Sequence, residues 1–252
     1  MTLFVSCTAV FPASAAPFKL GPSFFEPFDR IDSSRWYVSD GWVNGNHQGC
    51  SWSRDNVRLE RGVLKLLHTK APNHLRVFKC AEIRTNARFG FGLYEARIRV
   101  AAGSGLNTAI FTYSGPPLTN VHDEIDFEFL GKTPSKVQLN YFSSARGGHE
   151  SLEPLDTNAS VGFNNYAFEW LPDRIKWYVN GNLVRVTTGS MTPSVAGQFL
   201  LTLWSGSSAL DAWLGKFDDP RYSISADFDW VAYTRLGEKC RFPESISCLA
   251  PQ

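Results

Sequence analysis

Three carboxylates alternate along a ten-residue stretch and are the side chains best placed to do chemistry. In V-H-D-E-I-D-F-E-F-L, which runs from Val121 to Leu130, the acids are Glu124, Asp126 and Glu128. Successive side chains of a β-strand point to opposite faces, so the three acids would share one face and the large apolar residues between them the other. The apolar face predicts a buried side. The acidic face is then displayed toward solvent or a ligand.

Crowding these carboxylates should separate their pKa values, because neighbouring like charges resist ionising together. One protonated acid and one ionised carboxylate at the same pH are what glycoside cleavage requires. The Cα atoms of Glu124 and Glu128 would be about 13 Å apart, whereas a retaining glycosidase holds its carboxyl groups about 5 to 5.5 Å apart. On a strongly curved strand the two side chains could lean together, and inverting chemistry stays open. An exposed acidic face or a calcium site of three carboxylates is the alternative.

The rest of the chain has the two-residue period of β-strands. Gly92–Val100 alternates apolar and charged residues, and Ile175–Val186 carries Asn180-Gly181 between two apolar runs, which is a strong hairpin signal. Val57–Leu67 repeats this arrangement around Arg61-Gly62. Further runs rich in β-branched and aromatic residues are Lys136–Phe142, Tyr166–Trp170, Gln198–Trp204 and Ala226–Thr234.

No long amphipathic helix pattern interrupts these short runs, which predicts one all-β sandwich or jelly roll. Only the tail after Leu236 has the pattern of an appendage. A sandwich can bend so that one sheet forms a concave groove, where Trp and Tyr would stack on the sugars of an extended glycan. We expect at least half of the 8 Trp to lie in the core instead.

The charge balance excludes a large class of function. The chain has 252 residues, with 25 Lys and Arg against 24 Asp and Glu, a net charge of +1. A nucleic-acid binder needs a clustered excess of cations to neutralise phosphates, so no nucleic-acid partner is expected. The longest apolar stretch lies at the N-terminus and is well short of the roughly 20 residues that span a bilayer, so no membrane partner is expected.

The N-terminus predicts export. Met1–Ala16 carries no charge, is dominated by apolar and small residues, and ends in Ala13-Ser14-Ala15, a pattern that signal peptidase reads. No Lys or Arg precedes the apolar part, so an upstream start or an ordinary buried strand is the alternative. We expect a signal peptide at residues 1–15, a domain at 16–236 and a tail at 237–252, in a secreted protein that is extracellular or periplasmic.

The cysteines agree with an oxidising compartment. Without Cys7, which lies in the expected signal, the chain keeps Cys50, Cys80, Cys240 and Cys248, and four cysteines allow three connectivities. Only seven residues separate Cys240 from Cys248, so a local loop is the simplest closure and leaves the other two for each other. A zinc site is the alternative, and no CxxC or CxxH spacing supports it.

The acidic stretch closely resembles the active-site strand of glycoside hydrolase family 16. The resemblance rests on E-I-D-F-E-F-L-G at Glu124–Gly131 and points to bacterial lichenases, which are endo-1,3-1,4-β-glucanases, and to exopolysaccharide-depolymerising glycanases of rhizobia. It continues from about Phe24 to Thr234. Further matching motifs are Asp40–Gly45, Cys50–Trp52, Cys80–Arg84, Phe89–Glu95, Phe111–Pro116, Lys136–Tyr141, Gly147–Glu150, Ile175–Gly181, Trp213–Gly215 and Phe228–Thr234.

The resemblance implies a curved antiparallel β-jelly-roll with a concave glycan-binding cleft, and a retaining double displacement that needs no cofactor. Glu124 would be the nucleophile, Glu128 the acid/base, and Asp126 a residue that tunes their protonation. The unbroken E-x-D-x-E spacing favours a mixed-linkage or related glucan over a strict 1,3-glucan. The resemblance places along the cleft Asn44, Glu82, Arg84, Tyr113, Asn140, Trp204 and Trp213.

The resemblance also implies a disulfide between Cys50 and Cys80 and a structural calcium ion. Asp229 would be a calcium ligand, with backbone carbonyls supplying most of the other ligands. We expect a monomer whose partner is its polysaccharide substrate.

Three positions depart from the lichenases, which carry Trp where this chain has His122, a second aromatic residue where it has Phe142, and Asn where it has Thr202. His122 shares the face of Glu124, so a sugar-stacking ring is replaced by a smaller group that can become cationic. Our hypothesis is that His122 suits a bacterial exopolysaccharide with acidic substituents, such as succinoglycan. The alternative is that His122 packs against a loop.

The expected function is therefore a secreted endo-β-glycanase. A transglycosylase is a rival within enzymes, because another sugar could replace water as the acceptor. A non-catalytic lectin on the same fold is the rival of another class, and the intact carboxylate set argues against it.

Overall fold

A computed structural model of the protein describes residues 20–189, 191–219 and 221–249. The predicted signal peptide, residues 1–15, lies outside them, as does Cys7. Within the described ranges the two α-helices are α1 (Asp211–Leu214) and α2 (Ile246–Leu249), and no helix there is long enough to cross a membrane. Short 3₁₀ turns lie at η1 (Arg54–Asn56) and η2 (Ser208–Leu210).

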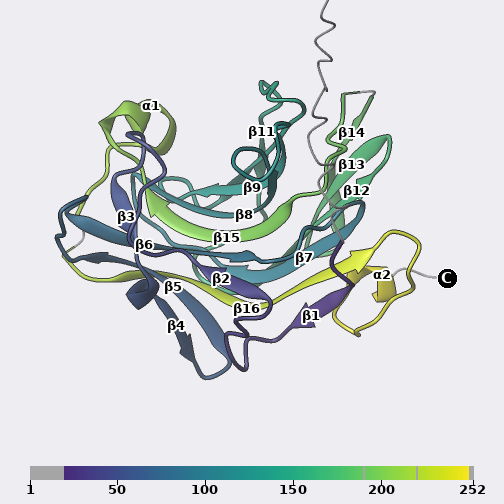
Figure 1. Ribbon diagram of the computed structural model, residues 1–252, viewed down its shortest axis with the longest axis horizontal. Helices are drawn as coiled ribbons and strands as arrows, with labels where there is room; N and C mark the ends of the chain where they lie inside the picture. Colours follow the sequence, from purple (N-terminus) through teal and green to yellow (C-terminus); the bar gives the residue numbers. More distant parts are fainter. Residues whose placement is uncertain (1–19, 190, 220, 250–252) are drawn as a thin grey trace, which may run out of the picture.

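Two curved, mainly antiparallel sheets pack face to face (Figure 1), and β5 (Val63–Lys70) pairs with β6 (Phe78–Thr85) at one edge to join them into a continuous 16-stranded sheet. The inner sheet consists of β11 (Ser151–Pro154), β10 (Lys136–Phe142), β9 (Asp123–Leu130), β8 (Leu106–Ser114), β15 (Gln198–Ser205) and β6 (Phe78–Thr85), in that order, with β2 (Trp36–Val38) and the parallel β3 (Cys50–Trp52) also on β6. The outer sheet consists of β5 (Val63–Lys70), β16 (Ile224–Arg235), β7 (Gly92–Arg99), β12 (Asn164–Leu171), β13 (Arg174–Val179) and β14 (Asn182–Thr188), with β1 (Phe24–Glu26) on β16 and β4 (Val57–Glu60) on β5.

The prediction of an all-β jelly-roll sandwich is confirmed, and the predicted hairpins lie where their turn residues indicated. Asn180 and Gly181 join β13 to β14 with φ values of 49° and 81°. Arg61 and Gly62 join β4 to β5 with φ values of 54° and 76°. Two consecutive positive φ angles match the right-handed twist of the flanking strands, which is why these short turns close the hairpins.

The core lies between the two sheets, and β9 contributes one face to it. Ile125, Phe127 and Phe129 are fully buried there. Phe129 lies edge-on against Tyr166 of the outer sheet, with ring centroids 4.6 Å apart. Because side chains alternate along a strand, the acids between these apolar residues must face the concave side. The predicted division of this strand into an apolar and an acidic face is confirmed.

The C-terminal tail packs on the outer sheet, although its pattern was that of an appendage. Phe242 is 7% exposed and lies 4.8 Å from Phe25 between ring centroids. The carboxylate of Glu95, a buried residue of β7, accepts hydrogen bonds from the Ser245 hydroxyl at 2.7 Å and from the Ile246 amide at 2.9 Å. Nothing local in the tail sequence could reveal these partners, because they lie about 150 residues earlier in the chain.

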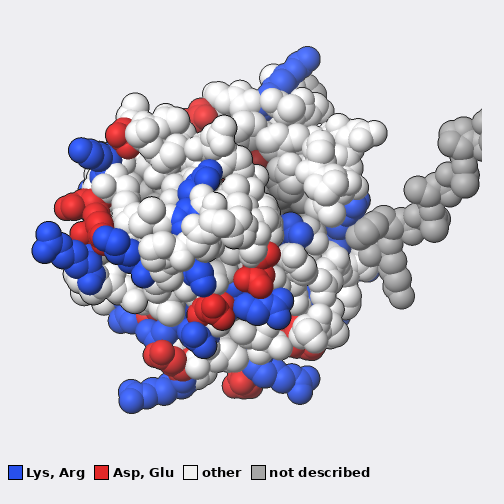
Figure 2. Space-filling model, turned by 60° about the vertical axis from the view of Figure 1, so that its left-hand side comes forward, with Lys and Arg blue, Asp and Glu red and all other residues white. Residues whose placement is uncertain are grey.

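The surface carries charges of both signs. In the view of Figure 2, Lys and Arg side chains lie among Asp and Glu side chains over the lower part of the molecule, while uncharged side chains dominate the upper part. This mixture agrees with the near-zero net charge and differs from the single-sign stripe that phosphate recognition requires.

Candidate active site

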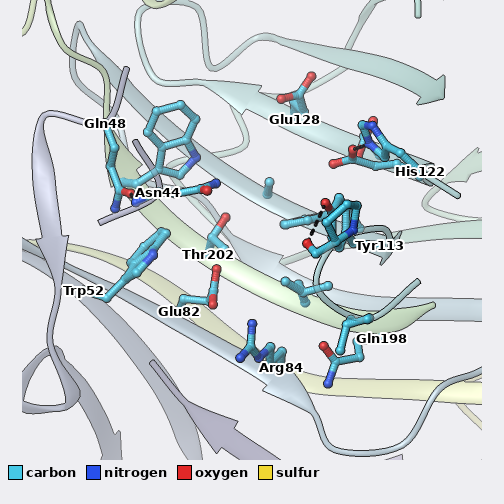
Figure 3. A pocket seen from close by; sticks show the side chains of 18 of the residues that line it. Asn44, Gln48, Trp52, Glu82, Arg84, Tyr113, His122, Glu128, Gln198 and Thr202 are labelled. Atoms are coloured by element: carbon cyan, nitrogen blue, oxygen red, sulfur yellow. Dashed lines mark hydrogen bonds and ion pairs between the residues drawn. The ribbon is translucent and has the colours of Figure 1, made fainter. Parts of the chain in front are cut away.

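A cleft of about 470 Å³ opens on the concave face of the inner sheet (Figure 3). Its floor comes from β6, β8, β9 and β15, and the loop before β3 supplies one wall. The structure brings together there most of the site residues named from the sequence. Those that line the cleft are Asn44, Glu82, Arg84, Tyr113, His122, Glu124, Asp126, Glu128 and Trp204.

Two predicted cleft residues lie outside this lining. Asn140 on β10 is 3% exposed, pairs in register with Asp126, and accepts a hydrogen bond at its side-chain oxygen from the Tyr141 amide. Trp213 of α1 donates from its indole nitrogen to Gln138 at 3.0 Å and lies 6.2 Å from the Trp204 ring. Both residues therefore lie beside residues of the site without lining the cleft themselves.

Strand β9 holds the three carboxylates between β8 and β10. Glu124 lies opposite Tyr113 on β8 and Phe142 on β10, and Glu128 lies opposite Gln138 on β10. Asp126 is 3% exposed between them. A central strand with partners on both sides has little freedom, so the three acids are presented at fixed positions along the floor.

Amide side chains hold Glu128. The Gln138 amide nitrogen donates to one carboxylate oxygen at 2.8 Å, and the Asn107 amide nitrogen donates to the other at 3.3 Å. The Gln138 side-chain oxygen in turn accepts from the Trp213 indole, so a chain of hydrogen bonds leads from α1 to the carboxylate. Because each partner is itself anchored, Glu128 is oriented before any substrate arrives.

Burial and mutual repulsion raise the pKa values of two of the three acids. Burial chiefly raises the pKa of Glu128 to about 8, the negative charge of Glu124 adds to this, and the hydrogen bonds from Asn107 and Gln138 oppose it. Burial also raises the pKa of Asp126 well above its usual range, with further contributions from the charges of Glu124 and Glu128. Glu128 is therefore protonated at neutral pH, as a general acid must be.

Glu124 has a different partner. Its carboxylate oxygen lies 2.6 Å from Nε2 of His122 (Figure 3). The His122 ring stacks on Phe142, with centroids 4.9 Å apart and planes 17° apart, and also contacts Tyr113 at 5.2 Å. The hydrogen bond with Glu124 is the main cause of the raised pKa of His122. The polar edge of the His122 ring therefore faces a carboxylate of the protein itself.

Strand β6 supplies the other charged part of the cleft. Glu82 is 5% exposed, accepts a hydrogen bond from Ser39 at 2.5 Å, and has a pKa raised by burial. The Arg84 guanidinium lies 4.6 Å from the Tyr37 ring centroid and 6.0 Å from that of Trp42. Stacking on two rings keeps this cation extended along the cleft.

The eight Trp side chains divide between core and cleft. Five are buried, which confirms the expectation that at least half would pack in the interior. Trp42 and Trp204 are half-buried and line the cleft, where an aromatic face is open to a sugar ring. Trp213 is also half-buried beside Trp204.

Several site residues escaped the sequence reasoning. Gln138 shares the face of Asn140 on β10, and a register between β9 and β10 would have identified it as the partner of Glu128. Trp52 and Thr202 are buried cleft residues, and among the described residues the Trp52 indole nitrogen and Thr202 hydroxyl have no hydrogen-bond partner. Both polar atoms are themselves buried beneath the surface of the cleft.

A disulfide between Cys50 and Cys80 supports the wall of the cleft, with Cα atoms 5.7 Å apart. It ties β3 to β6, and the side-chain nitrogen of Gln48, another cleft residue, contacts the Cys80 sulfur at 3.3 Å. The second predicted pair, Cys240 with Cys248, closes the loop of the tail. Both predicted disulfides are confirmed, and the zinc alternative is excluded for these four cysteines.

The predicted calcium ligand has a protein partner. Asp229 lies at the bulge of β16 on the outer sheet, and its carboxylate forms an ion pair with Arg97 of β7. Within the described part of the chain, no group of three or more His, Cys, Asp or Glu side chains could hold a metal ion. A calcium ion at Asp229 would have to displace the Arg97 guanidinium from this carboxylate. Most of its expected ligands are backbone carbonyls rather than side chains, so the calcium site stays a prediction.

Comparison with known proteins agrees with the geometry of the cleft. The family described as Glycosyl hydrolases family 16 matches residues 44–231, which include every carboxylate of the cleft. The chain belongs to this family. It is therefore a glycoside hydrolase, as the sequence predicted, and family 16 glucanases need no cofactor for catalysis.

Relatives with known names resemble this family 16 chain along most of its length. Endo-1,3-1,4-beta-glycanase ExoK of Rhizobium meliloti (strain 1021) is 47% identical over 90% of this chain and 84% of that protein. A beta-glucanase of Bacillus subtilis (strain 168) is 39% identical over 92% of this chain and 94% of that protein. A solved lichenase from a mouse hindgut metagenome has a TM-score of 0.82 at 39% identity, covering 86% of this chain and 100% of that one.

Proposed function

We propose that the protein is a secreted, retaining endo-β-glycanase that hydrolyses internal β-glucosidic bonds of a β-1,3/1,4-linked polysaccharide. The observation that carries this proposal is the contrast between Glu124 and Glu128 on one strand of the cleft. Glu128 is half-buried and held by two amides, with a pKa raised to about 8, whereas Glu124 is paired with an imidazole. A double displacement needs this pair of residues, one carboxylate as the nucleophile and one carboxylic acid as the proton donor.

In the first step the Glu124 carboxylate attacks the anomeric carbon of the bound sugar. The bond from that carbon to the leaving oxygen breaks, and Glu128 donates its proton to this oxygen. In the second step the ionised Glu128 takes a proton from water, which attacks the same carbon and returns the electron pair of the ester bond to Glu124. Asp126 is buried between them, and burial raises its pKa, which favours its neutral form beside Glu124.

Aromatic residues of the cleft offer platforms on which the sugars of a glycan could stack. Trp42 lies near the Arg84 guanidinium, which is 6.0 Å from the Trp42 ring centroid, whereas Tyr113 and His122 lie beside Glu124. Figure 3 shows Tyr113 and His122 on the other side of the cleft from Glu82. For the polymer itself we propose a bacterial exopolysaccharide such as succinoglycan. The similarity to a protein named endo-1,3-1,4-beta-glycanase supports a β-1,3/1,4-linked polymer, and Arg84 offers a cation to an acidic substituent of such a polymer.

Mixed-linkage glucan is the second candidate substrate, because the chain is similar to a solved lichenase and to Bacillus beta-glucanases. Secretion is supported by the two disulfides, which persist in oxidising compartments.

The test gives the purified protein lichenan and a succinylated acidic exopolysaccharide side by side and measures new reducing ends. Glu128→Gln is the control, because it keeps the shape of the side chain and removes the acid. More cleavage of the acidic polymer supports the exopolysaccharide proposal, and more cleavage of lichenan supports the second candidate. Longer products without new reducing ends would indicate a transglycosylase. Binding without cleavage of either polymer would support the alternative of a non-catalytic lectin.

A further inference from the structure

His122 lies directly before β9 and shares the concave face with Glu124, two residues later. Its Nε2 atom is 2.6 Å from a Glu124 carboxylate oxygen, a distance typical of a charge-assisted hydrogen bond. The side chains of His122 and Glu124 are 27% and 19% exposed, so bulk water screens the pair only in part.

Three strands hold the imidazole in this position. Phe142 of β10 stacks on it and Tyr113 of β8 contacts its other side, and both of these residues lie opposite Glu124 in the strand register. The His122 carbonyl accepts a hydrogen bond from the Ala145 amide at 2.8 Å. The ring therefore has little room to turn its nitrogen away from the carboxylate.

The backbone beside His122 is fixed as well. The buried Asp123 carboxylate accepts hydrogen bonds from the amides of Ser144, Ser194 and Val195, at 2.7, 2.7 and 2.9 Å. Two loops are thereby tied to the start of β9. The position of the imidazole depends on this framework and needs no bound glycan.

The titratable groups around the imidazole are mostly acidic. Glu124 faces it from β9 and Tyr113 from β8, the buried Asp123 carboxylate acts on it through its charge alone, and Phe142 brings no charge from β10. The loop that follows β10 carries Arg146, whose guanidinium contacts the Met191 sulfur at 3.8 Å. A proton on His122 is thus favoured by its neighbours, with partial burial opposing it.

We propose that His122 is a positioning residue that orients the Glu124 carboxylate and places a positive charge beside it. The proposal rests on the proposed function, in which Glu124 attacks the sugar. This charge lies beside the carboxylate that attacks the sugar, while burial raises the pKa values of the neighbouring Glu128 and Asp126. In the second step the charge also stabilises the carboxylate that is released when water breaks the ester bond to the sugar.

This role differs from direct recognition of an acidic substituent, which the sequence suggested for His122. The nitrogen nearest the cleft carboxylates is already occupied by Glu124, so an anionic sugar would compete with the protein's own carboxylate for it. The structure leaves Arg84, which stacks on two rings on the β6 side of the cleft, as the cation open to such a substituent.

The kinetic test compares His122→Phe, which keeps a ring to stack on Phe142, with His122→Gln, which keeps a hydrogen-bond donor without the charge. For His122→Phe we expect kcat to fall about tenfold with KM changed less than twofold, and the acid limb of kcat/KM to move up by about 1 pH unit. His122→Gln should recover part of kcat and leave the acid limb displaced. A change in KM alone, or an unmoved acid limb in both variants, would overturn the proposal.

A second measurement does not depend on catalysis. NMR titration of the five imidazoles identifies the His122 signal by its loss in His122→Phe. We expect this signal to titrate above pH 6.5 in the wild type and about 1 pH unit lower in Glu124→Gln. Equal titration in both proteins would refute the charge pairing. If the wild type cleaves neither glycan while the NMR shift is present, the proposed function fails and the pairing stands.

Discussion

Removing the amide of Gln138 should change the pH dependence of hydrolysis in a defined direction. Gln138 donates to Glu128 at 2.8 Å and accepts from the Trp213 indole at 3.0 Å. Its hydrogen bond favours the ionised form of Glu128 and thereby opposes the rise in pKa that burial causes. Gln138→Met keeps a side chain of similar length and removes both interactions.

The size of the effect follows from the kind of hydrogen bond lost. A hydrogen bond to a charged group contributes about 1.5 to 3 kcal/mol, and about 1.4 kcal/mol corresponds to one pH unit. Asn107 still donates to Glu128, so the lower end applies. We expect the pKa of Glu128 to rise further from about 8, moving the basic limb of kcat/KM up by about 1 pH unit. The weaker acid should lower kcat at pH 7 by up to about tenfold.

The assay measures initial rates of reducing-end release from pH 4 to 10 for the wild type, Gln138→Met and Trp213→Phe. Trp213→Phe is the matched control, because it removes the indole donor and leaves the amide that contacts Glu128; its basic limb should move less. The acid and basic limbs of the pH profile report apparent pKa values that belong to the coupled acids of the cleft together. A basic limb at the wild-type position in Gln138→Met would refute the assignment of Glu128 as the acid held by this amide.

Three further predictions concern stability. Burial lowers the pKa of His68 from 6.5 to about 4, so between these pH values the unfolded chain binds a proton that the folded chain does not. In urea titrations, the free energy of unfolding of the wild type should therefore fall by about 3 kcal/mol more than that of His68→Gln between pH 7.5 and pH 4. Ser245→Ala removes a hydrogen bond to Glu95, and burial raises the pKa of this carboxylate to about 7. Urea unfolding should show a loss of stability of about 2 kcal/mol at pH 8.5, where Glu95 is ionised, and of about 1 kcal/mol at pH 5.5. Replacing Cys50 and Cys80 together by Ser should cost about 2 to 4 kcal/mol in the same assay, because the unfolded chain regains the freedom of the closed loop.

Each of these outcomes has a clear opposite. Parallel pH profiles for the wild type and His68→Gln would mean that the imidazole is not buried in neutral form. A cost for Ser245→Ala that does not depend on pH would separate the tail from the ionisation of Glu95. Unchanged stability of the double serine variant would mean that the disulfide does not constrain the unfolded chain.

Strand periodicity was sufficient to predict the carboxylate face, because alternation along β9 is a local property. Glu124, Asp126 and Glu128 had to share a side once Ile125 and its apolar neighbours were buried. The hairpin turns were predictable for the same reason, since Asn-Gly and Arg-Gly meet the demand for positive φ within two residues.

Contacts across the sheet were not predictable in this way. Gln138 contacts Glu128 because of the register between β9 and β10, which depends on packing of the whole sheet. His122 turns toward Glu124 because Phe142, twenty residues later, stacks on its ring. The resemblance placed Asn140 in the cleft, but its side chain is buried in register with Asp126.

The most direct test of the central claim is to trap the covalent intermediate. The wild-type protein would be treated with an oligosaccharide activated at its reducing end and carrying fluorine at C2, then digested and analysed by mass spectrometry. The account predicts a glycosyl label on Glu124, within the peptide that holds residues 121–130, and release of the β-anomer first when normal substrate is cleaved. A label on Glu128, or release of the α-anomer first, would contradict it.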